Sequence, residues 1–192
     1  VAFGRTGSLF VSGQHDIRPT FLCLSKGITS GYLPLAVTLT TEEIYSAFYD
    51  DYHNWKMFIH SHSYSANPLA CSVANETLAI ICQNDFMAML TPKIKLMKEL
   101  GQQIAKDSKW CGEFRQQGMI AALELVKNND DKQPFPIENR VGYKVYLEAL
   151  KRGVFLRPLG DVIYFIPPLV INEDEITTMM NTARECMAVV LD

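Results

Sequence analysis

Runs of apolar residues separated by polar turns predict two strands in the first part of the chain. The runs lie at positions 21–24 and 35–40, and both are short enough for buried strands. The polar turn between them places Lys26 directly after a strand end. Thr41, followed by two glutamates and spaced apolar residues, predicts a helix start, because a hydroxyl and early carboxylates satisfy free backbone N–H groups. This helix should end before the polar stretch 50–54.

Longer apolar periodicity predicts helices in the middle of the chain and a mixture of helices and strands after it. Asn67-Pro68 opens one helix that runs to Ile81, since proline is tolerated in the first helical turn. Asp85 can cap a second helix, whose apolar positions continue to Ile104. The later elements that we expect are a strand at 119–126, a loop at 127–136, a helix at about 138–152 ended by Gly153, strands at 154–156 and 162–166, and a helix from about Asn172 with carboxylates at 173–175.

This order of elements predicts an α/β protein in two parts. Residues 1–85 have the strand, loop and helix order typical of the end of an α/β sheet domain, whereas residues 86–192 alternate helices and strands as a smaller α+β domain does. A length of 192 residues allows one domain, or one domain with part of another. Val1 is not a methionine, and the first residues look like a strand running into a loop, so we expect the chain to be a fragment.

Composition and charge narrow the classes of function. Hydrophobic residues make up 48% of the chain and charged residues 20%, which predicts an ordinary globular core. The formal net charge is −3 and the basic residues are scattered, so the chain shows no electrostatic footprint for DNA or RNA. The five cysteines are odd in number and form no C-x-x-C pair, which indicates reduced thiols in a cytoplasmic protein. We also expect no membrane-spanning helix and no secretory signal, since no apolar run fits either.

Lys26 and Arg157 are the chemical groups that the residues themselves suggest. A lysine at a strand end can be partly desolvated, and burial favours the neutral amine that forms an imine with an aldehyde cofactor. Arg157 lies between a strand and Pro158, where its planar guanidinium can be fixed and can bind a carboxylate through two hydrogen bonds. The alternatives are an ordinary surface lysine and an arginine in a surface or interdomain ion pair.

Two further groups of residues are better explained without a ligand. His60 and His62 lie two positions apart with no nearby carboxylate or cysteine, a poor set of zinc ligands, so we expect no metal site. An aromatic cluster could form a ligand-binding box, but aromatic side chains are more typical of a core or a subunit interface. The cluster comprises Tyr45, Phe48, Tyr49, Tyr52, Trp55 and Phe58.

Several segments together resemble the class-III branch of pyridoxal-phosphate-dependent aminotransferases. The segments are Gly4-Arg5-Thr6-Gly7, residues 17–20, the run from Leu24 to Tyr32 and the run from His60 to Cys71. They occur in the order of the family and close to its spacing, and the resemblance extends over essentially the whole chain. It implies the end of a fold-type I large domain, which binds pyridoxal phosphate, at 1–85, followed by a small α+β C-terminal domain at 86–192.

The resemblance implies roles for five residues. Lys26 would hold pyridoxal 5'-phosphate covalently and move a proton between the substrate carbon and the cofactor. Ser63, with His62 beside it, would bind the cofactor, the serine hydroxyl contacting the phosphate from the neighbouring subunit of a homodimer. Arg157 would contact the carboxylate of an oxo-acid substrate, and Arg5 would lie near the same substrate. From the residues alone, Ser63 could be an ordinary turn or cap hydroxyl, and Arg5 could form an ion pair.

Within the family, the runs 67–71, 153–160 and 163–168 most resemble enzymes that transfer an amino group from S-adenosylmethionine to 8-amino-7-oxononanoate in biotin biosynthesis. Such an enzyme also needs a glycine–serine loop for the phosphate, an aromatic residue on the pyridine ring and an aspartate at the pyridine nitrogen. We expect these groups upstream of Val1, so the 192 residues alone should be inactive. The alternatives are an aminotransferase with another ω-amine donor and a catalytically dead oligomerisation module.

Overall fold

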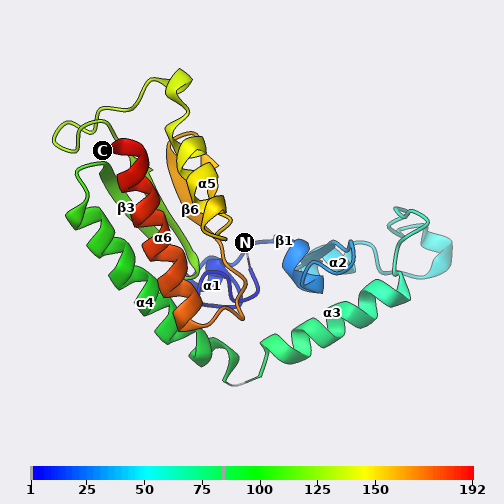
Figure 1. Ribbon diagram of the computed structural model, residues 1–192. Coiled ribbons are helices and arrows are strands. Elements are labelled where there is room, and N and C mark those ends of the chain that lie inside the picture. Colours follow the sequence, from blue (N-terminus) through cyan, green and yellow to red (C-terminus); the bar gives the residue numbers. More distant parts are fainter. Residues whose placement is uncertain (1, 84) are drawn as a thin grey trace. The chain divides into compact units, whose positions relative to one another are not determined.

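A computed structural model describes residues 2–83 and 85–192 of the chain (Figure 1). Contacts between Cα atoms divide it into two compact units. Unit 1 comprises residues 1–3 and 8–86, and unit 2 comprises residues 4–7 and 87–192. The segment 4–7 therefore packs with residues that are far away in the sequence, and it carries Arg5 with it.

Unit 1 contains a two-stranded antiparallel sheet and one long helix. Strands β1 (Phe21–Leu24) and β2 (Val37–Thr40) pair so that Phe21 faces Thr40 and Leu24 faces Val37. The first strand lies where the apolar run predicts it, and the second begins two residues later than expected. The other elements of the unit are α1 (Val11–Gln14), the 3-10 helices η1 (Lys26–Thr29) and η2 (Tyr52–Asn54), α2 (Glu42–Ser46) and α3 (Pro68–Ile81).

Helix α3 begins where the Asn67-Pro68 pair predicts, and the side chain of Asn67 explains why. It accepts hydrogen bonds from the backbone N–H groups of Leu69 (3.0 Å) and Ala70 (3.4 Å), which satisfies two donors that the helix itself cannot. Three of its four buried residues are small, so η1 can pack closely against it, and the hydroxyls of Ser30 and Thr77 lie 3.2 Å apart. The buried residues of the helix are Ala70, Ala74, Thr77 and Ile81.

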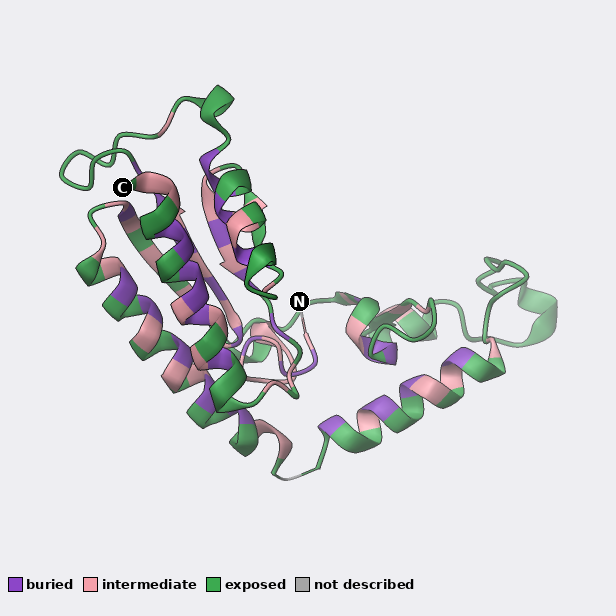
Figure 2. Cartoon of the chain, viewed as in Figure 1, coloured by how far each residue is buried: buried purple, intermediate pink, exposed green. Residues whose placement is uncertain are grey.

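The segment between β2 and α3 is largely exposed. Figure 2 shows exposed residues along most of this segment, and its aromatic side chains share that exposure, with Tyr49 at 73% and Tyr52 at 75%. Neighbouring rings contact each other, as Tyr45 and Tyr49 do with their centroids 5.5 Å apart. The aromatic cluster therefore lies outside the core of unit 1, so the core interpretation is wrong, and a ligand-binding box and a subunit interface both stay open.

Unit 2 is a four-stranded antiparallel sheet with its long helices on one face (Figure 1). The strand order is β3-β4-β6-β5. The strands are β3 (Cys111–Gln117), β4 (Ile120–Leu125), β5 (Arg157–Leu159) and β6 (Val162–Phe165), and the helices are α4 (Phe86–Asp107), α5 (Val141–Lys151) and α6 (Glu173–Leu191), with the 3-10 helix η3 (Ile137–Asn139) before α5.

The core of unit 2 lies between the sheet and these helices. Successive residues of a strand point to opposite faces, and in β4 and β6 only alternate residues are buried. The buried strand residues are Ala121, Leu123, Leu125, Ile163 and Phe165, and the fully buried helix residues include Leu90, Met97, Val145, Ile176 and Met180. The intervening strand residues, Glu124 and Tyr164 among them, occupy the opposite, open face of the sheet.

The prediction of a strand at 154–156 is wrong, because the strand lies at Arg157–Leu159. The turn between β5 and β6 sets Arg157 opposite Tyr164 and Leu159 opposite Val162. In that register Val154 would face Pro167, which has no backbone N–H to donate. Pro167 therefore disfavours pairing at Val154, and the observed pairing already ends at Arg157 and Tyr164.

The sequence pattern also misses β3, whose residues are mainly polar. Only its first residue, Cys111, is buried, so it lacks the apolar alternation of a half-buried strand and depends on pairing with β4. The other helices lie close to their predicted positions, and α6 begins directly after Asn172, as expected, with the side chain of Asn172 capping it. In the part of the chain that the structure describes, no helix is both long and apolar enough to cross a membrane.

Candidate functional site

Lys26 is the first residue of η1 and follows β1 after a single residue. The neighbouring residues fix the backbone here, because the Ser25 hydroxyl donates to the Leu35 carbonyl at 3.1 Å and Thr29 is only 1% exposed. The φ angle of Lys26 is 51°, in the left-handed region that costs a non-glycine residue about 1 kcal/mol. Such strain is maintained only where the surroundings determine the backbone, and it is concentrated at functional positions.

The side chain of Lys26 is exposed, so the expected desolvation is wrong within this unit. The packing that holds η1 comes from Ile28 and Thr29, which point into the unit, and the side chain at the start of the turn points away from it. The Lys26 amine forms no ion pair or hydrogen bond with any other described residue. Its three donors are therefore free for a ligand.

Ser63 lies in a loop whose other residues hydrogen-bond to one another. The His62 backbone N–H donates to the Ser65 hydroxyl (3.1 Å), and the Tyr64 N–H donates to Nδ1 of His62 (3.1 Å). The Ser65 N–H in turn donates to the His62 carbonyl (2.9 Å). Ser63 has no such bond to any residue that the structure describes, so its hydroxyl and N–H remain available. Nδ1 of His62 accepts the hydrogen bond from Tyr64. Nε2 of the same ring is then free to donate to a ligand, in addition to the groups of Ser63.

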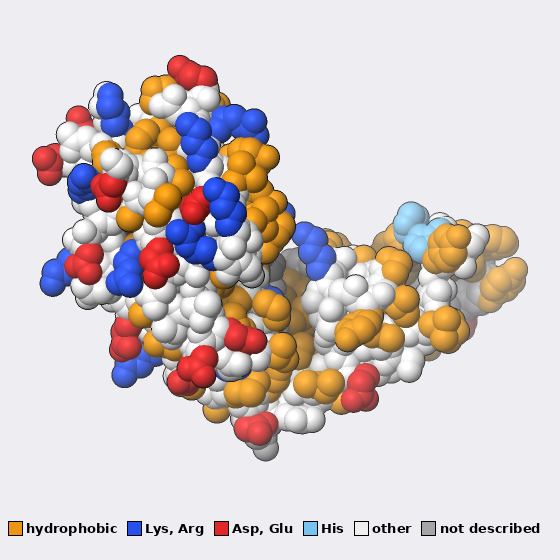
Figure 3. All heavy atoms as spheres, in the orientation of Figure 1, with side chains coloured by type: hydrophobic (Ala, Val, Ile, Leu, Met, Phe, Trp, Pro, Cys, Tyr) orange, Lys and Arg blue, Asp and Glu red, His pale blue; other side chains and the backbone are white. Residues whose placement is uncertain are grey.

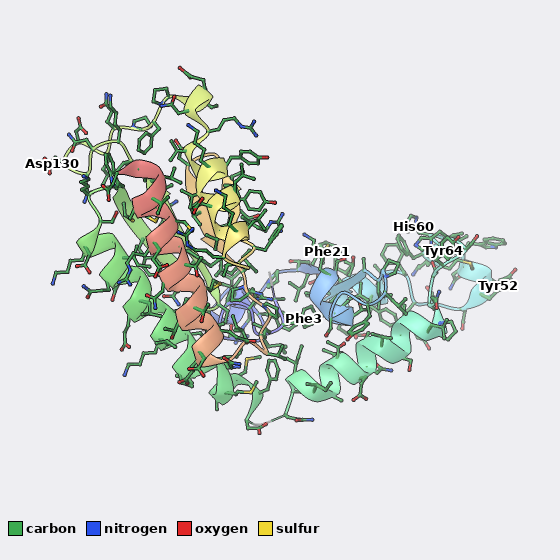
Figure 4. The ribbon with its side chains drawn as sticks, in the orientation of Figure 1. Phe3, Phe21, Tyr52, His60, Tyr64 and Asp130 are labelled. Carbon is green, nitrogen blue, oxygen red and sulfur yellow. The ribbon has the colours of Figure 1, made fainter. Side chains whose placement is uncertain are left out.

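Lys26 and Ser63 lie at different places along α3. The turn that begins at Lys26 contacts the helix at Thr77, through Ser30, whereas the Ser63 loop leads into its N-terminus at Asn67. Ten residues separate Asn67 from Thr77, about 15 Å of helix. Figure 4 shows Phe21, the first residue of β1, well away from His60 and Tyr64 in the loop before α3. The structure does not bring Lys26 and Ser63 of one chain together.

Arg157 lies on the open face of the sheet in unit 2. It is the first residue of β5, it is exposed, and its guanidinium carbon is 5.5 Å from the centroid of the Tyr164 ring on β6. Stacking on a neighbouring aromatic ring orients a guanidinium. Arg157 forms no ion pair with a described residue, so its donor fork is free for a carboxylate.

Arg115 provides a direct contrast within the same sheet. The pairings Arg115↔Ala122, Ala122↔Tyr164 and Tyr164↔Arg157 place the two arginines in one row across the open face. The guanidinium of Arg115 binds the carboxylates of Glu124 and Glu113, and these contacts raise its pKa. The same face thus holds one arginine whose charge is neutralised and one that lacks a carboxylate, as a ligand-binding arginine should.

Arg5 is held inside unit 2 by its backbone and its side chain. Its carbonyl accepts a hydrogen bond from the Met119 N–H (2.9 Å), and its guanidinium donates to the Pro167 carbonyl. Partial burial lowers its pKa, and no carboxylate among the described residues compensates its charge. A half-buried guanidinium without a counterion favours an anionic ligand. Arg157 pairs with Tyr164 on β6, and Arg5 donates to Pro167 shortly after the same strand.

Lys26 and Ser63 each suit one part of a cofactor that has an aldehyde and a phosphate, although the two residues of one chain lie apart. A primary amine without a partner is what an aldehyde needs, and the Ser63 hydroxyl and N–H suit a phosphate oxygen, since loop N–H groups near a helix N-terminus bind anions. Lys26 and Ser63 offer these groups. The part of the chain that the structure covers shows no cluster of three or more His, Cys, Asp or Glu side chains that could hold a metal ion.

A hollow of about 620 Å³ in unit 1 contains none of these residues. It lies beside α1 and the two strands, and its lining includes Phe10, Ile17, Leu22 and Leu39. Figure 3 shows hydrophobic side chains spread over the face of unit 1 that it displays. The apolar lining offers no charged group for a substrate carboxylate other than Arg18.

Comparison with known proteins connects these residues to one family. The family model of class-III aminotransferases matches residues 1–187. An adenosylmethionine-8-amino-7-oxononanoate aminotransferase from Aquifex aeolicus is 47% identical over 182 residues, which are 95% of this chain and 40% of that protein. The protein of the same name from Geobacter sulfurreducens is 46% identical over 181 residues, covering 94% of this chain and 40% of that one.

A solved structure agrees with this similarity. The crystal structure of adenosylmethionine-8-amino-7-oxononanoate aminotransferase from Methanocaldococcus jannaschii matches with a TM-score of 0.90 and 38% identity, over 98% of this chain and 44% of that one. The chain spans about 40% of the length of the curated relatives that it matches.

Proposed function

The chain belongs to the class-III aminotransferase family, and from this membership we propose that it forms the C-terminal portion of a longer enzyme. That enzyme would transfer an amino group from S-adenosylmethionine to 8-amino-7-oxononanoate and yield 7,8-diaminononanoate for biotin biosynthesis. The substrates follow from the names of the similar proteins. The observation that carries the proposal is the pair of arginines without carboxylate partners, Arg5 and Arg157, beside β6.

The chain's own residues would divide the work of a reaction with pyridoxal phosphate. Bound pyridoxal phosphate supplies an electron sink for the charge that develops when a substrate carbon loses its proton. Lys26 would hold the cofactor through its free amine and then carry that proton on Nζ. Ser63 would donate to the phosphate, with Nε2 of His62 as a further donor. Arg157 and Arg5 would orient the oxo acid by its carboxylate.

A homodimer is part of the same proposal. The distance along α3 between the Ser63 loop and the turn at Lys26 supports a contact of Ser63 with the cofactor of a second subunit. The exposed aromatic cluster supports an interface, because a contiguous apolar patch is rarely left in water. The five unpaired cysteines support a reducing compartment, the cytoplasm.

Covalent labelling of the full-length protein tests the proposal. After incubation with pyridoxal phosphate and reduction with borohydride, peptide mapping should find the cofactor on Lys26. Lys26→Ala should abolish transamination, whereas Lys132→Ala should not, although Lys132 is also exposed and has nearly the same φ of 52°. Cofactor attached to another lysine would show that the assignment of Lys26 is mistaken.

The donor is tested separately, with S-adenosylmethionine and a panel of ω-amines. We expect turnover of 8-amino-7-oxononanoate with S-adenosylmethionine to exceed turnover with every other amine. Preference for another amine would keep the aminotransferase chemistry and replace the donor. A full-length protein that binds the cofactor but turns over none of the amines would instead be a dead module.

A further inference from the structure

The loop that carries Arg5, residues 4–7, packs against the turn between β3 and β4. This turn joins Gln117 to Ile120 through two residues, Gly118 and Met119. Gly118 has φ of +59°, as expected at the first central position of a tight hairpin turn. The N–H of Met119 is not needed by the ladder, and it donates to the Arg5 carbonyl at 2.9 Å. The turn therefore offers a backbone donor to the arginine loop.

The absence of a side chain at Gly118 allows this contact. A Cβ atom built there would lie 2.3 Å from the carbonyl carbon of Thr6 and 2.7 Å from the N atom of Gly7. Both are backbone atoms, so no rotamer change could relieve the overlap. Gln116 also holds the turn, because its Nε2 donates to the carbonyls of Gly118 and Ile94, both at 2.9 Å. The backbone of Arg5 is thus held against a rigid turn.

The guanidinium of Arg5 is held at a second place, the segment after β6. It donates to the Pro167 carbonyl. Two residues further on, the Leu169 carbonyl accepts a hydrogen bond from Nζ of Lys93 on α4 at 3.1 Å. Lys93 is only 9% exposed and has no carboxylate partner among the described residues. Lys93 therefore ties to α4 the same short segment that Arg5 binds.

A buried ammonium is a costly way to hold a loop. A neutral side chain could make the same bond to a carbonyl at a lower desolvation cost. A second positive charge close to the segment that binds Arg5, however, favours an anion at that place. A lysine at this position therefore adds positive charge to the segment that receives Arg5, which suits an anionic ligand.

We propose that Gly118 and Lys93 are positioning residues for recognition of the substrate carboxylate, acting through Arg5. Gly118 sets the backbone of the arginine loop, and Lys93 sets the segment that receives the guanidinium. The proposal rests on the function proposed above, in which Arg5 binds the carboxylate of the oxo acid. It adds two residues that need not touch the substrate.

Steady-state kinetics of the full-length enzyme test this with two acceptors, 8-amino-7-oxononanoate and its methyl ester. Gly118→Ala and Lys93→Met should each raise KM for the acid about five- to tenfold, the size expected when a charge-assisted contact is misplaced rather than removed. KM for the ester, kcat and cofactor loading should change less than twofold. Methionine is an unbranched side chain of similar length to lysine. Lys93→Met therefore tests the positioning role even if Gly118→Ala fails to fold.

Two further variants separate the possible failures. Gly153→Ala is the matched control, since Gly153 also has a positive φ, +77°, but nothing lies within 4 Å of a Cβ there. It should lower stability without a preference between acid and ester. Arg5→Ala should raise KM for the acid selectively.

If Arg5→Ala is selective and neither Gly118→Ala nor Lys93→Met is, the positioning role is wrong and the function of Arg5 stands. If Arg5→Ala shows no selectivity, the proposed role of Arg5 and the positioning role both fall. Equal effects of Gly118→Ala and Gly153→Ala on the two acceptors would make Gly118 a residue that serves stability only.

Discussion

Arg157 and Arg115 show how two residues of one type in the same sheet can differ in purpose. Both lie in one row across the open face of the sheet in unit 2. Two glutamates neutralise Arg115, whereas the described residues offer Arg157 only the ring of Tyr164. Of two arginines on the same face, the one without a carboxylate partner is better suited to bind an external ligand.

Arg157→Ala should therefore impair binding of the oxo acid rather than the cofactor. Loss of a bidentate, charge-assisted contact of roughly 1.5–3 kcal/mol should raise KM for the acid about ten- to hundredfold. Arg157→Lys should recover part of this, because an ammonium keeps the charge without the fork. Arg115→Ala is the control and should leave KM unchanged. Loss of thermal stability with normal KM in Arg157→Ala would identify a structural arginine.

A second prediction at this scale concerns the buried thiol of Cys111. Burial raises its pKa from 9.0 to about 11. Between these values the unfolded chain loses the thiol proton while the folded chain keeps it, so stability falls as pH rises through this window. A pKa difference of about two units changes the free energy of unfolding by at most about 2–3 kcal/mol. Urea unfolding at several pH values should show this decline, and it should be weaker in Cys111→Ala.

Cys82→Ala serves as the comparison for this measurement, since Cys82 is exposed. That variant should retain the full alkaline decline. Identical slopes for Cys111→Ala and the parent protein would mean that other groups cause the decline.

Two residues at the start of helix α6 stabilise its first turn. Oδ1 of Asn172 accepts from the Glu175 N–H at 2.8 Å, and the Glu175 carboxylate accepts from the Asn172 N–H at 2.9 Å. This capping box satisfies two backbone donors reciprocally. The box is a local feature, because the cap and its partner are three residues apart.

Asn172→Ala should loosen the first turn of α6 by about 1 kcal/mol. Hydrogen exchange of the amides in that turn should accelerate about fivefold, while exchange near Met187 should be unaffected. Asn172→Asp should behave like the parent protein, as a carboxylate also caps. Glu173→Ala, in the same turn but outside the box, should have a smaller effect. Unchanged exchange in Asn172→Ala would show that tertiary packing alone holds the turn.

At the scale of the whole molecule, unit 1 exposes large aromatic side chains, which in the proposed longer enzyme would contact a second subunit. Trp55 is 67% exposed and Phe58 is 67% exposed, within a segment that has few buried residues. Aromatic side chains at such density are typical of the centre of a subunit interface. This is the basis for expecting a homodimer that involves segments 41–58 and 66–83.

Light scattering of the full-length protein should give the mass of a dimer. Trp55→Glu should weaken the dimer by about 2 kcal/mol or more, roughly a thirtyfold increase in the dissociation constant, because interface aromatics carry much of the binding energy. Ile137→Glu is the control, since Ile137 is 88% exposed but lies in unit 2. An active monomer would overturn the expectation, and so would an equal effect of the two substitutions.

The sequence by itself determined the features that depend on near neighbours. The caps at Asn67 and Asn172, the helices that follow them and the turn that presents Lys26 all arise from residues within a few positions of each other. Side-chain chemistry also indicated which residues carry a free amine or a guanidinium fork. These inferences succeed because capping and periodicity are local effects.

The tertiary structure decided which charges find a partner and which remain free. Arg5 and Gly118 are far apart in the sequence, and only the docking of one loop on a hairpin turn brings them together. The strand expected at 154–156 moved to Arg157–Leu159 because the register of a hairpin depends on both strands. The partners of Arg115, the isolation of Arg157 and the exposure of Lys26 likewise result from packing between distant segments, which no local pattern encodes.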